Sequence, residues 1–287
     1  MSFRPGSGSN RVDLHLHTTA SDGRCSPLEL VEQAAAAGLS VMAATDHDTT
    51  ASVEEVRVRA AERGIESIAG IEVTAVEDGR DVHMLGYFLN PADTAFLEFL
   101  AGQRRMRVDR VHTIAARLAS LGMPVDLTSA LAAAGQQSGR AIGRPQVARA
   151  MIEAGHVANT REAFDRWLGS DRPAFVSRSG PSPEAVIATI HQAGGLASLA
   201  HPGRTQIDAR IPALRDAGLD ALEAYHSDHD AVTAERYQRM ADELGLLITG
   251  GSDYHGEPGH GVSIGSSTLP PDAWQRLRAA RHRHAAG

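Results

Sequence analysis

The sequence predicts an α/β fold in which strand–helix units form a (β/α) barrel that is interrupted by a helical insertion. Short apolar runs alternate with longer amphipathic runs, which is the pattern of strand–helix units repeated around a parallel sheet. Several amphipathic runs are followed by glycine, which supplies the left-handed cap of a helix end. The alternation stops between about residues 101 and 173. With 287 residues and 42% hydrophobic content, the chain is long enough to bury a full core.

The first part of the chain, residues 1–100, is expected to form the first barrel segment. Its apolar runs predict four strands, at Val12–His17, Val41–Asp46, Ser67–Val73 and Asp81–Leu89. Its amphipathic runs predict two helices, Pro27–Ala37 before Gly38 and Ser52–Arg63 before Gly64.

Residues 101–173 are expected to form the insertion, because this stretch contains several helical patterns and no convincing strand. The helices are predicted near Arg105–Leu121, Leu127–Ala134, Pro145–Ala154 and Thr160–Leu168. The stretch is either an elaborated connection between two barrel strands or a lid beside the active site. The lid is favoured, because long insertions in barrels often carry function.

Residues 174–287 are expected to complete the barrel. Three further strands are predicted, at Leu196–Ala200, Ala221–Ala224 and Leu246–Gly250. Two further helices, Pro183–Ala193 and Ala231–Leu244, each end at a glycine.

The charge pattern excludes several functions. The formal net charge of −7 argues against binding to long duplex nucleic acid, which depends on an excess of Lys and Arg. All 28 basic residues are arginine, so catalysis through a lysine is excluded.

No apolar run reaches the roughly 18 residues of a membrane span, and Met1 to Asn10 lacks the apolar stretch of a signal peptide. We therefore expect no membrane partner and a cytoplasmic location.

Histidines and carboxylates gather at the ends of the predicted strands. Alternate side chains of a strand share a face, so His15 and His17 can bind one ion, and a turn can bring Asp22 back over the strand end. The same placement recurs at His47, Glu72, His83, His201, His226, Asp253 and His255. In a parallel barrel these strand ends meet at one rim, where barrel active sites are built. The pattern therefore predicts a metal centre.

Seven other histidines are interpreted as ordinary hydrogen-bonded core or surface residues: His112, His156, His191, His229, His260, His282 and His284. His282 and His284 repeat the spacing of His15 and His17. However, they are expected in a terminal helix, where residues two apart face nearly opposite directions.

The donor set narrows the choice of ion and substrate. Imidazole and carboxylate ligands without thiolate suit Mn, Fe or Zn, and all three stay open. The three carboxylates Asp22, Glu72 and Asp253 cannot neutralise two or three divalent ions. The pocket therefore stays positive and favours a phosphate ester, which metal-activated water would attack at phosphorus.

The motifs around these ligands resemble those of the PHP (polymerase and histidinol phosphatase) family. They are Asp13-x-His15-x-His17, Ser21-Asp22-Gly23, Thr45-Asp46-His47-Asp48, Gly70-Ile71-Glu72, Ala200-His201-Pro202 and Ser252-Asp253-Tyr254-His255. The resemblance covers both barrel segments and implies a distorted (β/α)7-type barrel with a helical insertion. It also implies an activity like that of the stand-alone trinuclear 3′,5′-nucleotide bisphosphate phosphatases, with manganese favoured over iron or zinc.

Carried over by position, the resemblance implies three ligand groups. They are His15, His17, Glu72 and Asp253; then Asp22, His47 and His255; and finally Glu72, His83 and His201. Glu72 would bridge two ions, and Glu72, Asp253 and His226 are the residues expected to act in catalysis. Asp13 and Asp46 are expected to orient imidazoles, a role that metal-bound histidines commonly need.

Arginines are the expected partners of the substrate, because their planar guanidinium groups bind phosphate through two hydrogen bonds. Arg144, at the predicted start of an insertion helix, is favoured, followed by Arg178 and Arg204; His226 is a further candidate for substrate contact and for protonation of the leaving group. A small nucleotide is the expected substrate. The alternatives are a 5′→3′ exoribonuclease acting on short RNA ends, histidinol-phosphate phosphatase, and a non-catalytic module stabilised by metal.

Overall fold

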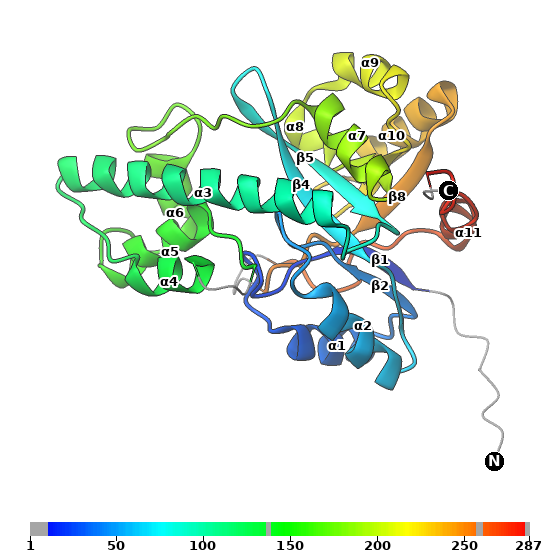
Figure 1. The fold of residues 1–287 in the computed structure, drawn as a ribbon, viewed down its shortest axis with the longest axis horizontal. Coiled ribbons are helices and arrows are strands. Elements are labelled where there is room, and N and C mark those ends of the chain that lie inside the picture. Colours follow the sequence, from blue (N-terminus) through cyan, green and yellow to red (C-terminus); the bar gives the residue numbers. More distant parts are fainter. Residues whose placement is uncertain (1–10, 136–138, 257–260, 285–287) are drawn as a thin grey trace.

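The computed structural model describes residues 11–135, 139–256 and 261–284, whose strands form two sheets. In Figure 1 the sheets lie together, with helices around them and a long helix extending away to one side. The predicted metal ligands lie in the sheet strands or just after them, and the extended helical part lies beside the sheets. The mixed α/β architecture predicted from the sequence is confirmed.

The first sheet is parallel and has the order β1 (Val12–Leu16), β2 (Val41–Ala44) and β3 (Glu66–Ser67). Helix α1 (Pro27–Ala36) follows β1, and α2 (Val53–Glu62) follows β2. Ser26 begins α1 with a capping box, in which its hydroxyl accepts from the Glu29 N–H while the Glu29 carboxylate accepts from the Ser26 N–H.

The second sheet has the order β4 (Gly70–Glu77), β5 (Arg80–Tyr87), β6 (Leu196–Leu199), β7 (Ala221–His226) and β8 (Leu247–Gly251). Strand β5 runs antiparallel to both β4 and β6, whereas β6, β7 and β8 are parallel. Asp78 and Gly79 both have positive φ, as a tight hairpin between β4 and β5 requires.

The predicted all-parallel arrangement is therefore wrong at β5. The single predicted strand Ser67–Val73 is also two strands, β3 and β4, which belong to different sheets. Isolated bridges connect the sheets at Val12–Leu269, Leu16–Tyr254 and His47–Glu72. Among the described residues the strands do not close into a continuous barrel, so the (β/α)7-type barrel stays a prediction.

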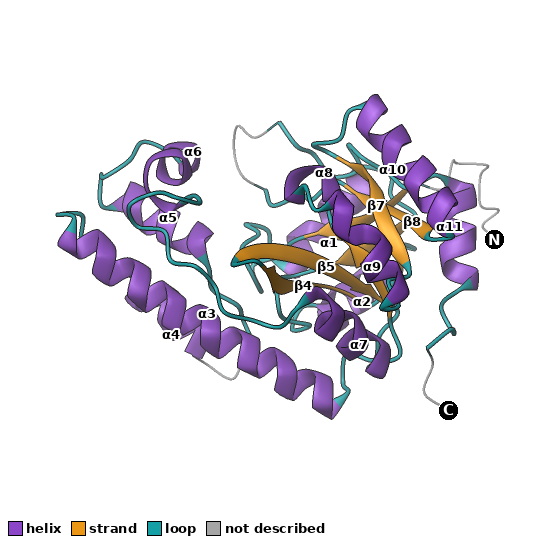
Figure 2. Ribbon diagram, turned by 90° about the horizontal axis from the view of Figure 1, so that it is seen from above, coloured by secondary structure: helices purple, strands orange, loops and turns teal. Residues whose placement is uncertain are grey.

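The insertion contains α3 (Thr94–Ser120), α4 (Thr128–Gly135), α5 (Arg144–Glu153), α6 (Thr160–Ala163) and a π-helical turn, η1 (Phe164–Leu168). Figures 1 and 2 show α3 running from the sheets to the outer end of the insertion. Phe96 and Leu100 of α3 pack into the main core, whereas Ile114 and Leu118 pack into a separate core with α5. Residue 101, the predicted start of the insertion, thus falls within one continuous helix.

The remaining helices are α7 (Pro183–Gln192), α8 (Pro202–Thr205), η2 (Asp208–Arg210), α9 (Ile211–Asp216), α10 (Ala231–Leu244) and α11 (Pro271–Ala279). The predicted position of His282 and His284 in a terminal helix is wrong, because α11 ends at Ala279 and both histidines lie in the turns that follow. His260 lies outside the described residues. None of the helices in the described part of the chain is long and apolar enough to cross a membrane.

Candidate metal centre

The nine predicted metal ligands lie together where the two sheets meet. They come from β1 and the loop after it, from β4 and β5, and from the residues that follow β2, β6 and β8: His15, His17, Asp22, His47, Glu72, His83, His201, Asp253 and His255. Because β5 is antiparallel, His83 reaches the centre from within its strand and not from a carboxyl end. The centre is thus assembled from both sheets.

The first ligand group consists of His15, His17, Glu72 and Asp253, as predicted. The Nε2 atoms of His15 and His17 both lie 3.3 Å from Glu72 Oε2. The same two nitrogens lie 3.3 and 3.2 Å from Asp253 Oδ1. Two imidazoles and two carboxylates therefore face one point, with the nitrogen and oxygen spacing of ligands around a cation.

The second group surrounds Asp22. The Nε2 atom of His255 lies 3.2 Å from Asp22 Oδ1, and Nε2 of His47 lies 3.5 Å from Asp22 Oδ2. His17 joins this group as well, since its Nδ1 lies 3.7 Å from Asp22 Oδ1. Helix α5 fixes the loop that carries Asp22, because the Gln146 side chain donates a hydrogen bond to Ser21 O at 2.7 Å.

The third group is built on Glu72. Its Oε1 lies 2.8 Å from His83 Nδ1 and 3.0 Å from His201 Nε2. Its Oε2 lies 3.1 Å from His47 Nδ1, so His47 faces the second and the third group at once. Glu72 contacts ligands of two groups through its two oxygens, which is the arrangement required of a bridging carboxylate.

The buried polar atoms fit bound cations. His15 Nε2, both ring nitrogens of His17, His47 Nδ1 and Glu72 Oε2 are buried and lack a hydrogen-bond partner within the protein. Unpaired buried polar atoms are costly, and buried carboxylates are stable when paired or bound to metal. The donors are imidazole nitrogens and carboxylate oxygens without a thiolate, a set that binds divalent transition metals. The residues present therefore fit a multinuclear metal centre.

The electrostatics of the centre favour positive charge. Burial acts to raise the pKa of Glu72, but its interactions with His47, His83 and His15 hold that pKa well below the ordinary value. Burial lowers the pKa of His47 to about 3, which keeps its imidazole neutral and able to bind an ion. Burial also acts to lower the pKa of His17, yet the nearby carboxylates of Asp253 and Glu72 raise it to about 10. The carboxylates thus create a negative potential that a bound cation would neutralise.

The backbone at the centre adopts conformations that are rare for residues other than glycine. Asp253, His201 and Asp48 have φ values of 56°, 28° and 50°. Strain of this kind persists where the surrounding structure holds it, and it is concentrated at functional sites. Gly251 allows β8 to approach β1, since a Cβ atom there would lie 2.4 Å from the backbone nitrogen of His15. The Asp253 N–H consequently donates to His15 O at 2.9 Å.

Glu223 of β7 is a functional residue that the sequence reasoning missed. Its Oε1 lies 2.8 Å from His15 Nδ1, and its Oε2 accepts the His201 N–H at 2.7 Å. The side chain is fully buried. A carboxylate in the apolar run Ala221-Leu222-Glu223-Ala224 was the available signal, because such a group is rarely buried without partners.

Replacing Glu223 by glutamine is expected to weaken metal binding about 10- to 100-fold, as is typical when a group that orients a metal-binding histidine is lost. Glutamine has one carbonyl oxygen, which cannot serve both His15 and the His201 N–H. The measurement is the metal concentration that gives half-maximal hydrolysis of an aryl phosphate, the class of reaction predicted from the sequence, with exposed Glu235→Gln on α10 as the control. If kcat at saturating metal falls while the metal requirement is unchanged, Glu223 does not act by positioning the ligands.

Asp13 and Asp46 do not have the predicted role of orienting imidazoles. Asp13 accepts the backbone N–H groups of Ser252 and Gly265, both at 2.9 Å. Asp46 accepts the N–H and hydroxyl of Thr18 and the hydroxyl groups of two serines. Both carboxylates therefore hold the loops at the strand ends in place.

His226 lies behind Asp253. Its side chain is fully buried, and its Nε2 lies 3.3 Å from Asp253 Oδ2. Its Nδ1 accepts the Asp228 N–H at 3.0 Å, so the neutral ring carries its proton on Nε2, facing Asp253. In this position His226 can hold Asp253 in place, but it does not reach the cleft for the direct substrate contact that was predicted.

Seven of the predicted ligands, all except His15 and His17, line a cleft of about 860 Å³, and Arg144, Arg178 and Arg204 line it as well. Arg144 is the first residue of α5, and its guanidinium lies 3.1 Å from Asp81. Arg178 is buried and pairs with Asp48 at 3.0 Å. Arg204 is half exposed and lies 3.3 Å from Asp253 Oδ2, next to the metal ligands.

Two arginines of α3, Arg107 and Arg110, also line the cleft and were not predicted. Arg107 pairs with Asp48 at 2.5 Å, and Arg110 pairs with Asp81 at 3.1 Å. Their spacing of three residues places both on one face of α3, but no sequence pattern indicates which face of the helix meets the cleft. Arg144 Cζ lies over the rings of Phe164 and Phe175, at 5.7 and 5.8 Å from their centroids, which is within the range of cation–π contacts.

Comparison with known proteins finds that the family model described as PHP domain matches residues 13–171. A 5′-3′ exoribonuclease from Haemophilus influenzae is 33% identical over 94% of this chain and 100% of its own length. A 3′,5′-nucleoside bisphosphate phosphatase from Chromobacterium violaceum is 32% identical over 93% of this chain and 96% of its own length. The structure of a protein from Bifidobacterium adolescentis, assigned as a metal-dependent phosphoesterase, superposes with a TM-score of 0.84 at 33% identity, covering 93% and 95% of the two chains.

Proposed function

The chain belongs to the PHP domain family and is a metal-dependent phosphoesterase, and from this premise we propose that it removes the 3′-phosphate from nucleoside 3′,5′-bisphosphates. The products are the 5′-monophosphate and inorganic phosphate. Water adds to phosphorus, the bond between phosphorus and O3′ breaks, and O3′ leaves as a hydroxyl after taking up a proton.

One observation carries this proposal: the cleft contains a second cationic centre beside the metal ligands. Arg107, Arg110, Arg144 and Arg178 surround two carboxylates, Asp48 and Asp81, which leaves a surplus of positive charge. Asp81 and His83 are alternate residues of β5, so the two centres are connected by one strand face over roughly 7 Å. A small molecule with two phosphates matches two cationic centres at this separation.

The arginines at Asp81 are suited to anchoring the second phosphate. Burial lowers the pKa of Arg144 to about 10, which still leaves the guanidinium charged at neutral pH. Burial acts to raise the pKa of Asp81, but Arg110 and Arg144 bring it down to about 2. Two guanidinium groups sharing one carboxylate keep unused N–H donors for a phosphate. Binding energy from this remote phosphate would then orient the reacting ester.

The metal centre is proposed to bind the 3′-phosphate, with manganese favoured as the ion. Divalent ions held there would activate water and neutralise the charge that develops on the phosphoryl oxygens. Glu72 and Asp253 hold the ligand groups together, and His226 keeps Asp253 in place through the proton on its Nε2. Arg204, next to Asp253 at the mouth of the cleft, is placed to contact the same phosphate.

The second candidate function is a 5′→3′ exoribonuclease acting on short RNA ends. It is favoured by the Haemophilus influenzae relative with that name, which the chain matches over its whole length. The cationic centre would then bind a backbone phosphate of the RNA end. The net charge of −7 favours a mononucleotide or a short end over a long polymer.

The test is a substrate panel containing adenosine 3′,5′-bisphosphate, short 5′-phosphorylated RNA, histidinol phosphate and cyclic AMP, with released phosphate and nucleotide products both quantified. We expect the highest kcat/KM for the bisphosphate, with phosphate and 5′-AMP formed in equal amounts. A higher kcat/KM for RNA, with mononucleotides released, would replace this proposal by the exoribonuclease. A preference for histidinol phosphate would exclude both nucleotide functions.

A further inference from the structure

A second cluster of ligand-type side chains lies outside the cleft, among histidines that the sequence analysis interpreted as ordinary. His191 is in the last turn of α7, Asp220 directly precedes β7, and His284 lies in the turns after α11. One ligand atom from each residue lies within 4.8 Å of the other two. The three residues come from separate segments, which only the tertiary fold brings together.

Both imidazoles approach the same carboxylate through the same ring atom. His191 Nε2 lies 2.8 Å from Asp220 Oδ2, and His284 Nε2 lies 3.1 Å from Asp220 Oδ1. The two rings stack with their centroids 3.6 Å apart and an angle of 14° between their planes. Around a tetrahedral ion with ligand bonds of roughly 2.0 Å, neighbouring ligand atoms are about 3.3 Å apart. The two nitrogen-to-oxygen separations are close to that value, and one ring must turn out of the stack for both nitrogens to face the same ion.

The surroundings hold two of these groups in place. Asp220 is buried and also accepts the Ala197 N–H at 3.0 Å, which fixes its carboxylate. Gly218 makes room for the His191 ring, since a Cβ atom there would lie 3.1 Å from His191 Cε1. The His191 and His284 side chains are 18% and 29% exposed, so an ion could enter from solvent.

We propose that His191, Asp220 and His284 form a zinc-type metal site that fastens the C-terminal turns to the body of the protein. Two imidazoles and one carboxylate are a donor set that zinc binds, with water completing the coordination. The site is separate from the catalytic centre and does not depend on the proposed substrate. Because the ion binds the folded chain, it is expected to stabilise that chain by an amount that increases with the logarithm of zinc concentration once the site is occupied.

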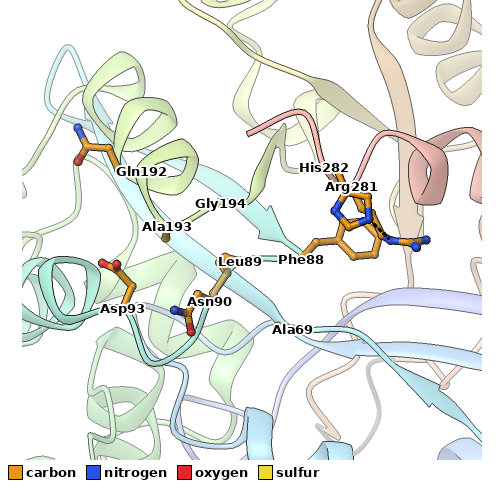
Figure 3. A pocket seen from close by; sticks show the side chains of 10 residues that line it. All are labelled: Ala69, Phe88, Leu89, Asn90, Asp93, Gln192, Ala193, Gly194, Arg281 and His282. Carbon is orange, nitrogen blue, oxygen red and sulfur yellow. Dashed lines mark hydrogen bonds between the residues drawn. The ribbon is translucent and has the colours of Figure 1, made fainter. Parts of the chain in front are cut away.

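His282 offers a matched control in the same segment. Figure 3 shows His282 with Arg281 beside Phe88, on the far side of a pocket of about 450 Å³ from Gln192. Its Nε2 accepts a hydrogen bond from Arg281 Nε at 3.0 Å, so its ring is engaged outside the three-residue cluster. Equivalent substitutions at positions 282 and 284 therefore separate a general effect on the turns from an effect on the ion.

The experiment removes metal from the full chain by chelation, adds zinc, removes the excess and counts zinc per chain. Wild type and His282→Gln are expected to retain one equivalent more than His191→Gln or His284→Gln. Zinc is also expected to raise the Tm of wild type more than that of His284→Gln. Phosphatase activity of His284→Gln with saturating metal should equal that of wild type, which keeps this test independent of the proposed function.

Cobalt and a cysteine substitution provide a direct signature. His284→Cys should bind Co²⁺ with a sulfur-to-cobalt charge-transfer absorption, because thiolate is also a ligand for such ions, whereas His282→Cys should not. Equal zinc content in wild type and His284→Gln would overturn the proposal. The proposal would also fail if the two cysteine variants gave the same cobalt spectrum.

Discussion

Replacing Glu72 by glutamine is expected to lower turnover by at least about 1000-fold while leaving the fold intact. The two carboxylate oxygens of Glu72 face five imidazoles in total, from His15, His17, His47, His83 and His201. Glutamine keeps the shape of the side chain but is neutral and presents an NH2 group to ligand positions. Loss of a bound ion removes several kcal/mol of transition-state stabilisation, and each ~1.4 kcal/mol corresponds to a factor of ten.

The measurements are kcat, metal content per chain and circular dichroism. Glu77→Gln, at the far end of the same strand, is the matched control, because Glu77 pairs with Arg210 and lies outside the ligand groups. We expect the control to retain activity and metal. If Glu72→Gln kept its metal and more than a tenth of the wild-type turnover, Glu72 would not be the bridging ligand.

Arg144→Ala is expected to lower kcat/KM for adenosine 3′,5′-bisphosphate by about 10- to 100-fold, as for the loss of a charge-assisted hydrogen bond. For the 3′-monophosphate, which lacks the anchoring phosphate, the same substitution should change kcat/KM by less than a factor of about three. Arg144→Lys should recover part of the activity, since it restores the charge but not the planar pair of donors. The two enzymes and the two substrates thus form a double-mutant cycle, in which the difference between the two losses of kcat/KM measures the interaction between the Arg144 guanidinium and the second phosphate.

Exposed Arg105→Ala on α3 controls for a general loss of positive charge and is expected to leave both substrates unaffected. Arg110→Ala should reproduce the selective loss, because Arg110 shares Asp81 with Arg144. If Arg144→Ala reduces activity toward both substrates equally, the guanidinium has a structural role. If wild type hydrolyses both substrates equally well, the second phosphate has no anchor in this cleft.

Local sequence patterns predicted most of the secondary structure, because each depends on neighbouring residues. Helix α10 has the predicted bounds Ala231–Leu244, since Asp230 caps its start and Gly245 adopts the left-handed conformation at its end. The ligands of β1 followed from side-chain alternation in one strand. The direction of β5 could not be predicted in this way, because parallel and antiparallel strands share the same apolar pattern and Asp78-Gly79 was not recognised as a hairpin turn.

Contacts between segments that are distant in the sequence could not be predicted from local patterns. Arg110 looks like any exposed arginine of an amphipathic helix, and its role depends on the angle at which α3 crosses the sheets. His191 and His284 belong to a cluster only because the chain after α11 returns to the end of α7. Asp13 and Asp46 are expected to orient imidazoles, a role that metal-bound histidines commonly need, whereas Asp13 accepts backbone N–H groups and Asp46 accepts mostly hydroxyl groups.

The pairing of Asp22 with His255 also constrains how the enzyme is made. During translation His15, His17 and Asp22 are synthesised well before Asp253 and His255. Until Asp253 and His255 are in place, the first and second ligand groups each lack a member, and any ion they bind is held by an incomplete set. Metal selection is therefore expected after translation, when β8 has docked beside β1.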